Sequence, residues 1–290
     1  MLRSPKIVAG LVILAFFVLL AVAGPLLVGG DPTKTSGAGL AGPSAQHWLG
    51  TTQSGQDVLT QVVYGARVSM GVGVLSAVIA TALSIVVGLV GGYVGGVVDE
   101  ILSLITNIFL VLPALPLVIV LAGYLPSRGV TSVAAVIAVT GWAWGARVLR
   151  AQTLTLRGRD YVQAAKAGGE RIWRIIFAEI LPVEFPVIAT SFLATVLAAI
   201  LAEAGLSFLG LANLSTVSWG TMLYFAQNNQ ALLVGAWWWF IPPGLCIALI
   251  GAGLGLLNFG IDEIANPRLR TVLPKRARRA RRSARMEVAR

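Results

Sequence analysis

The sequence predicts an all-α integral membrane protein with six transmembrane helices. Hydrophobic residues make up 57% of the 290 residues and charged residues only 12%, which is about half of the share that soluble domains carry. A soluble globule of this length could not bury so much apolar surface. The apolar stretches are continuous and far longer than a barrel strand, which favours helices over strands.

The predicted spans are long enough, or nearly so, to cross roughly 30 Å of hydrocarbon. In chain order they are 7–28, 69–93, 101–125, 130–146, 185–206 and 233–259. The first follows Arg3 and Lys6 and contains Ala21-Val-Ala23, a pattern that also suits a cleaved signal peptide. We expect a retained anchor, because the apolar stretch exceeds a signal-peptide core and runs on without a polar break.

The distribution of Lys and Arg predicts the orientation of these spans. With both termini cytoplasmic, nineteen of the 22 Lys and Arg residues lie inside, and the positive-inside rule favours that arrangement. The chain then divides into an anchor with an external loop (1–68), a five-helix core (69–270) with an internal loop (147–184), and a basic tail (271–290). We expect the tail to be disordered and to attract anionic lipid.

The internal loop begins with the pattern of a short helix and a tight turn. Good helix formers follow Asp160, which suits an N-cap, and Gly168-Gly169 suits a left-handed cap at the other end. Ala164 and Ala165 are small enough to let another protein approach closely. This helix is therefore either a docking element or an amphipathic helix on the inner leaflet, and the residues alone favour neither.

A second helix is expected from Glu170 to the fifth span. Its helical spacing predicts an apolar stripe, which consists of Ile172, Trp173, Ile176, Phe177, Ile180 and Leu181. Glu170 and Arg174 have the spacing of a favourable i, i+4 ion pair. Pro182 and Pro186 mark the entry to the span.

The loop resembles the docking-loop motif of ABC-importer membrane subunits, which reads EAA, three residues, G, nine residues, I-x-L-P. The matching residues are Gln163, Ala164, Ala165, Gly169, Leu181 and Pro182. Gln163 replaces the glutamate of the motif, and Glu179 stands at its isoleucine position. The resemblance implies that these residues contact an ATPase, without any ion pair that the glutamate would make.

Three further segments extend the resemblance over roughly residues 5–270. They are 47–59 (HWLGTTQSGQDVL), 203–220 (EAGLSFLGLANLSTVSWG) and 266–270 (NPRLR). These are similar to segments of dipeptide, oligopeptide and nickel importers, and the order resembles that of the C-type permease subunit. The resemblance implies a type I importer permease of the bacterial cytoplasmic membrane. Its implied partners are a second homologous permease, two cytoplasmic ABC ATPases and an extracytoplasmic solute-binding protein.

The residues do not support a catalytic or nucleotide site on this chain. A Walker A site needs a Gly-Lys pair, and no lysine here follows a glycine. The single His47 and single Cys246 cannot build a multi-ligand metal cluster. We therefore expect no cofactor on this chain, with ATP and Mg²⁺ on the partner ATPases. Nucleic acid is not an expected partner, because the basic tail has no interleaved aromatic residues.

Glu203 is the only acid or base that the predicted spans contain, and such residues are functional candidates. It lies about 18 residues, or about 27 Å, beyond the inner end of its span, close to the outer interface. We therefore favour a structural role, in which Glu203 holds the following segment 206–211, over contact with substrate.

Other residues indicate bends and close packing within the spans. The prolines that interrupt the third and sixth spans are Pro113, Pro116, Pro242 and Pro243. They predict kinks, which serve either gating or ordinary packing. Gly88 and Gly92 have the spacing of a close helix–helix contact, within the protein or with another subunit.

Aromatic residues gather around the last external loop, and they allow two interpretations. The group consists of Trp219, Tyr224, Phe225, Trp237, Trp238, Trp239 and Phe240. An interfacial aromatic belt is the first interpretation, and a vestibule that meets the solute is the second.

The functional hypothesis is a permease subunit of a heteromeric ATP-driven importer that works by alternating access. The residues leave the solute open among dipeptides, oligopeptides, nickel, heme and other small molecules. A secondary transporter is an alternative, but it would need buried acids for ion coupling, and only Glu203 is available. A membrane-embedded enzyme or scaffold is the other alternative.

Overall fold

The computed structural model describes residues 5–124 and 129–265, and its regular elements in these ranges are all helices. Five of them are long and apolar enough to cross a membrane, and a sixth span results if one bent helix pair counts as one. The prediction of an all-α, six-span membrane protein is therefore confirmed. The NPRLR segment (266–270) and the basic tail (271–290) lie outside the described residues.

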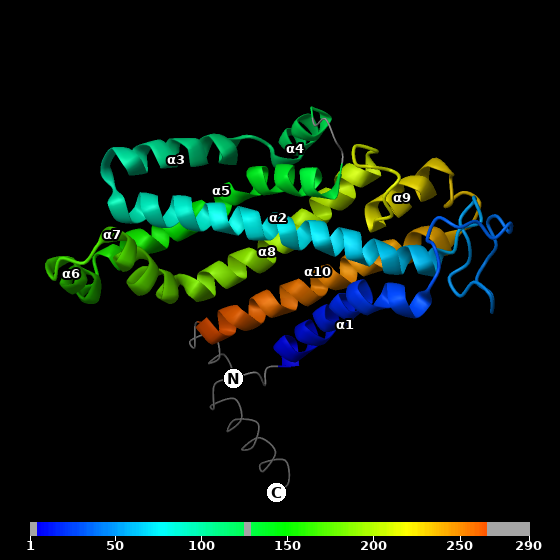
Figure 1. Cartoon of the computed structure of the whole chain (residues 1–290), viewed down its shortest axis with the longest axis horizontal. Helices are drawn as coiled ribbons and strands as arrows, with labels where there is room; N and C mark the ends of the chain where they lie inside the picture. The colour runs from blue at the N-terminus through cyan, green and yellow to red at the C-terminus, as the bar shows by residue number, and fades with distance from the viewer. Residues whose placement is uncertain (1–4, 125–128, 266–290) are drawn as a thin grey trace, which may run out of the picture.

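The helices form an elongated bundle (Figure 1). The long helices are α1 (Pro5–Val28), α2 (Val58–Val94), α5 (Val130–Arg157), α8 (Leu181–Phe208) and α10 (Trp237–Ala265). The shorter ones are α3 (Gly96–Val111), α4 (Ala114–Gly123), α6 (Asp160–Ala167), α7 (Ile172–Arg174), a π-helix (Ile175–Ile180) and α9 (Trp219–Asn228). Helices α6 and α7 lie at one end of the bundle, whereas α9 and the segment 29–57 lie at the opposite end.

Helix α2 is the centre of the bundle and packs against α1, α5 and α8. It begins at Val58, well before the predicted residue 69, so the segment before it is shorter than predicted. The side chain of Asp57 caps the helix by accepting a hydrogen bond from the backbone N–H of Thr60 (2.8 Å). The first turns contain Gln61 and Arg67, whose polarity kept this part of the helix out of the apolar stretch.

Glycines allow α2 and α5 to approach closely, as the spacing of Gly88 and Gly92 predicted. A Cβ atom added at Gly88 would lie 2.8 Å from the carbonyl oxygen of Ala146. A Cβ atom added at Gly92 would lie 2.7 Å from Cβ of Thr153. Both distances are shorter than real Cβ contacts, so the two backbones meet only because these residues lack side chains.

We expect Gly92→Val to destabilise the bundle by at least about 1–3 kcal/mol, because the added side chain overpacks the α2–α5 contact. Thermal unfolding of the purified protein in detergent would measure the effect. Gly71→Val on the same helix is the matched control, since its added Cβ would meet no described atom within 4 Å beyond the backbone of its own helix. Equal melting temperatures for the two variants would contradict the close-packing interpretation.

The predicted third span is two helices that meet at an angle of 91°. Leu112 is extended (φ −70°, ψ 130°), as expected for a residue before proline, and Pro113 is the N-cap of α4. Pro116 lies in the first turn of α4, where proline is tolerated. The bend at Pro113 therefore replaces the milder kink that was predicted.

Helix α5 continues to Arg157, so the connection predicted to start at residue 147 is helical for its first part. Arg150 forms a bidentate pair with Asp99 on α3, with 2.7 Å between Nη2 and Oδ2. This pair stabilises the charged Arg150 in the part of α5 that continues beyond the predicted apolar span. Charge alone was therefore a poor indicator of where this helix ends.

Helices α1 and α10 pack against each other through small residues. A Cβ atom added at Gly253 would lie 2.8 Å from Cγ2 of Ile13. Pro242 and Pro243 lie near the start of α10 and do not end it. The start of α1 lies against the last turns of α10, where a Cβ atom added at Gly260 would meet the side chain of Ile7.

The segment 29–57 is a compact structure and not an extended loop. Thr51 is fully buried, and its hydroxyl donates to the carbonyl of Ala38 (2.7 Å) and accepts from the N–H of Ala41 (2.8 Å). The indole N–H of Trp238 donates to the carbonyl of Thr51 (3.2 Å). The segment is therefore fixed onto the first turn of α10.

Candidate functional site

The candidate docking helix, α6, projects at one end of the bundle (Figure 1). Arg159 is its N-cap, so the prediction that Asp160 is the N-cap is wrong by one residue. Asp160 occupies the first turn, where a carboxylate interacts favourably with the helix dipole. Gln163 and Ala164 are exposed, whereas Val162 is fully buried against the bundle. One face of α6 is thus anchored and the other is open.

The end of α6 is a Schellman turn centred on Gly169. The N–H of Glu170 donates to the carbonyl of Ala165 (3.1 Å), and the N–H of Gly169 donates to that of Lys166 (3.1 Å). Gly169 has φ +77°, and an added Cβ would have no described residue within 4 Å apart from its two chain neighbours. Glycine is therefore required here for its backbone conformation and not for space.

Gln163, which departs from the motif glutamate, joins α6 to α5. Its side-chain amide donates to the carbonyl of Arg157 at 2.7 Å. A carboxylate could not donate this hydrogen bond. The substitution therefore exchanges a charge for a bond that holds the start of α6.

The second helix of the loop differs from its prediction. It begins at Ile172 and not at Glu170, although the Glu170–Arg174 ion pair is present at 3.2 Å. Of the predicted stripe, Ile176 and Ile180 are buried, Leu181 is partly buried, and Ile172, Trp173 and Phe177 are about half exposed or more. Ile175, which the predicted stripe did not include, is buried together with Ile176 and Ile180.

A π-helical turn accounts for the difference from Ile175 onward. In the segment Ile175–Ile180 the hydrogen bonds span five residues, and the N–H of Leu181 donates to the carbonyl of Ile176. Pro182 has no N–H, so it cannot bond to the carbonyl of Ala178 as an α-helix would require. The wider turn rotates the following residues away from the 3.6-residue spacing that predicted the stripe. Trp173 and Phe177 instead stack on the exposed side, with ring centroids 6.1 Å apart.

The structure brings two of the six docking-motif residues to one cluster at this end of the bundle. Ala165 and Leu181 both pack against a buried group that consists of Leu89, Tyr93, Leu149, Val162, Ile175, Ile176, Ile180 and Ile188. This group joins α6 and the π-helix to α2, α5 and α8. Pro182 remains exposed at the start of α8. The cluster therefore connects α6 to the long helices through packed side chains.

Glu203 is buried where α2, α8 and α9 meet. Its two carboxylate oxygens accept hydrogen bonds from the hydroxyls of Ser69 (2.9 Å) and Ser207 (2.8 Å). The Ser69 hydroxyl in turn accepts the backbone N–H of Trp219 (3.2 Å). These contacts are the kind that a structural role requires. Glu203, Pro113, Pro116, Pro242 and Pro243 do not assemble into a single site with the docking residues.

Glu184 is a second buried acid that sequence reasoning missed. It is 1% exposed in the first turn of α8, and its Oε1 accepts a hydrogen bond from the Thr153 hydroxyl on α5 (2.8 Å). The statement that Glu203 is the only acid in a span is therefore wrong. The two prolines that flank Glu184 indicated the start of the span at residue 185, whereas the apolar helix extends without interruption over Ile172–Phe208.

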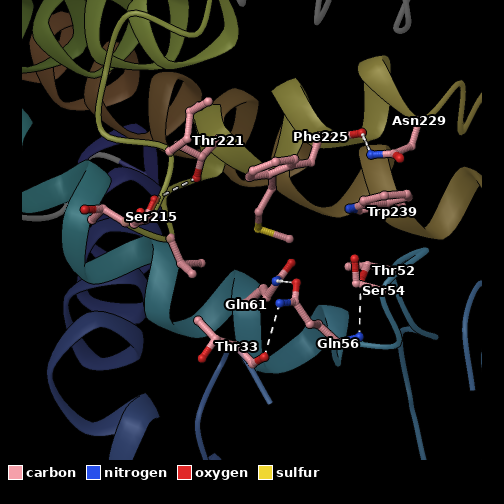
Figure 2. A pocket seen from close by; sticks show the side chains of 14 residues that line it. Thr33, Thr52, Ser54, Gln56, Gln61, Ser215, Thr221, Phe225, Asn229 and Trp239 are labelled. Atoms are coloured by element: carbon pink, nitrogen blue, oxygen red, sulfur yellow. Dashed lines mark hydrogen bonds between the residues drawn. The ribbon is translucent and has the colours of Figure 1, made fainter. Parts of the chain in front are cut away.

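A polar cavity of about 300 Å³ lies at the opposite end of the bundle (Figure 2). Residues of the segment 29–57, of α9 and of the connection before α9 line it together with Gln61 and Trp239. Most of the described lining residues carry hydroxyl or amide groups, and none of them is charged. Nearby, Thr33 donates its hydroxyl and N–H to Asp31 (2.6 and 2.8 Å), and these bonds hold the pKa of Asp31 below its usual value.

The tryptophans at this end are not a uniform interfacial belt. Trp219 is fully buried and packs edge-to-face on Phe17 of α1, with ring centroids 5.6 Å apart. Trp239 is 3% exposed, whereas Trp237 is 51% exposed. The belt interpretation therefore fails for Trp219 and Trp239, because they form part of the core beside the cavity.

A bundle of long apolar helices with a bent third span defines a multi-pass membrane protein. The family described as binding-protein-dependent transport system inner membrane component matches residues 84–271. The chain belongs to this family. It is therefore a transport component of the inner membrane and not an enzyme, which decides against the membrane-enzyme and secondary-transporter alternatives.

Individual relatives agree with the family assignment. The dipeptide transport system permease protein DppC of Bacillus subtilis is 37% identical over 92% of this chain and 83% of its own length. The oligopeptide transport system permease protein OppC of the same organism is 34% identical over 92% of this chain and 88% of its own length. A probable peptide ABC transporter permease of Sinorhizobium fredii is 36% identical over 92% of this chain and 90% of its own length.

Proposed function

We propose that this chain is one of two permease subunits in an ATP-driven importer of peptides. The relatives that it resembles are named for dipeptides and oligopeptides. Two cytoplasmic ATPases bind ATP and Mg²⁺, and an extracytoplasmic binding protein delivers the solute. Both termini and α6 face the cytoplasm, as the positive-inside distribution favours.

The observation that carries this proposal is the construction of α6. Its inner face is anchored by Val162, its end is fixed by Gly169, and its outer face presents Gln163 and Ala164. This is a rigid, open surface that another protein can grip and move. An amphipathic helix on a lipid surface would instead present a broad apolar face, and the exposed residues of α6 include the polar Gln163 and Lys166.

The mechanism follows from the contacts of α6 with the long helices. When the ATPases come together on ATP, they move α6, and the buried cluster around Val162 and Ile176 transmits the motion to α5 and α8. The cavity between the two permeases then changes from inward-facing to outward-facing and accepts solute from the binding protein. This is a rocking scheme between two states.

Copurification and reconstitution test the proposal. The tagged chain should retain two ATPase subunits and a second six-span protein. Proteoliposomes that contain the complex should take up a dipeptide only with ATP and the binding protein. Uptake by the purified chain alone, without nucleotide or companions, would refute the proposal.

A further inference from the structure

The cavity at the α9 end is lined by a tryptophan whose buried N–H donates to no acceptor among the described residues. The indole Nε1 of Trp239 is buried and has no hydrogen-bond partner within the described residues. The neighbouring tryptophans differ, because Trp238 donates to Thr51 and Trp219 donates to Val62. An unsatisfied buried N–H is costly and rare in proteins. Figure 2 shows the indole nitrogen of Trp239 on the side of its ring that faces the cavity.

A fixed acceptor lies across the cavity from this donor. The amide nitrogen of Gln61 donates to the carbonyl of Pro32 (3.3 Å) and to Oε1 of Gln56 (2.8 Å). Gln56 donates in turn to the carbonyl of Thr33 (3.2 Å). These bonds fix the orientation of both amides and leave the Gln61 oxygen as an acceptor, which Figure 2 shows directed into the cavity.

We propose that this cavity is a binding subsite for an uncharged stretch of peptide, in which Trp239 donates to a backbone carbonyl and Gln61 accepts from a backbone N–H. This inference rests on the proposed function, because that function supplies the peptides that the cavity would meet. Peptide backbone carries one donor and one acceptor per residue, which matches this pair. Hydroxyls such as those of Thr52 and Ser215 supply adaptable further contacts.

The charge and size of the cavity restrict further which peptides could bind there. The described lining residues offer no counter-charge, so a charged peptide terminus would be desolvated there without a partner. Met222 and Phe225 form an apolar wall that suits a small side chain. A volume of about 300 Å³ is at the lower limit for ligand sites, which corresponds to one or two residues.

The peptide stretch could come from the transported solute or from a loop of the binding protein, since both present the same backbone. The test uses the full chain in membrane vesicles and an N-acetylated, C-amidated dialanine that carries a photoreactive diazirine. Mass spectrometry then locates the labelled residues. Labelling of the segments 29–61 and 214–239, and its competition by unlabelled blocked dialanine, are the expected results.

Two variants and a matched control make the test specific. Trp239→Phe keeps the ring and removes only the N–H, so we expect labelling to fall at least about fivefold with no loss of thermal stability. Ser215→Trp fills the cavity from an exposed position and should also reduce labelling. Trp237→Phe, half exposed on the same helix and not part of the lining, should label like the parent.

A second arm separates the two sources. A photoreactive group at position 215 that captures the binding protein, but not the blocked dipeptide, would support the site with the binding protein as its source. Capture of neither, or undiminished labelling in Trp239→Phe, would overturn the inference. Because labelling needs neither ATP nor the ATPases, this outcome is independent of the copurification that tests the proposed function.

Discussion

Replacing Gly169 with valine should uncouple ATP hydrolysis from transport while leaving membrane insertion intact. Gly169 has φ +77°, a conformation that costs an ordinary residue about 1–2 kcal/mol and a β-branched residue more. The Schellman turn would open, and α6 would lose its fixed direction relative to α7. We expect at least a roughly tenfold loss of solute-stimulated ATPase activity and of uptake in the reconstituted complex.

Gly168→Ala is the matched control for this substitution. Gly168 has φ −73°, which alanine adopts without strain, and an added Cβ there would meet only ordinary contacts at 3.4 Å and beyond. The control should therefore assemble and transport like the parent. Normal uptake and normal ATPase stimulation in Gly169→Val would show that the direction of α6 does not matter for coupling.

Replacing Glu203 with alanine should cause a large loss of stability at the α9 end. The change removes the acceptor for the hydroxyls of Ser69 and Ser207, both fully buried, and leaves a cavity in the core. We expect the free energy of unfolding to fall by at least about 2 kcal/mol. Thermal unfolding in detergent measures this change. The loss of the monodisperse peak in size-exclusion chromatography serves as the signal of unfolding.

Two further variants separate the hydrogen bonds from the charge. Glu203→Gln keeps one acceptor oxygen and adds an amide that can donate to a serine hydroxyl, so its loss of stability should be clearly smaller. Glu100→Ala, an exposed acid on α3, is the control and should be neutral. If Glu203→Ala melts with the parent, Glu203 does not hold α2, α8 and α9 together.

The apolar stretches predicted the interior of the spans well and their ends poorly. Hydropathy identifies only the part of a helix that lies in hydrocarbon, whereas α2 and α5 continue beyond it in polar sequence. Asp57 extends α2 by capping it, and the Arg150–Asp99 pair stabilises the extension of α5. Both depend on particular partners, and the second partner is distant in sequence.

The docking loop was predictable in part for similar reasons. The short helix and its glycine turn follow from local preferences, so the range Asp160–Ala167 agrees with the expectation. The buried positions after Ile172 differ from the expectation. The π-turn changes the helical period from Ile175 onward, and the expected spacing of 3.6 residues does not include such a turn. The cavity could not be predicted at all, since residues as far apart as Gln61 and Trp239 line it.

The π-turn at Ile175–Ile180 has a consequence for how this family of loops can vary. Such a turn holds one residue more than a regular α-helix would over the same path. Deleting a single residue there would restore regular winding over the same path, so α6 would keep its direction relative to α8. Loops of this family with and without the surplus residue can therefore place the short helix in the same way, and a change of length by one residue is absorbed within the turn itself.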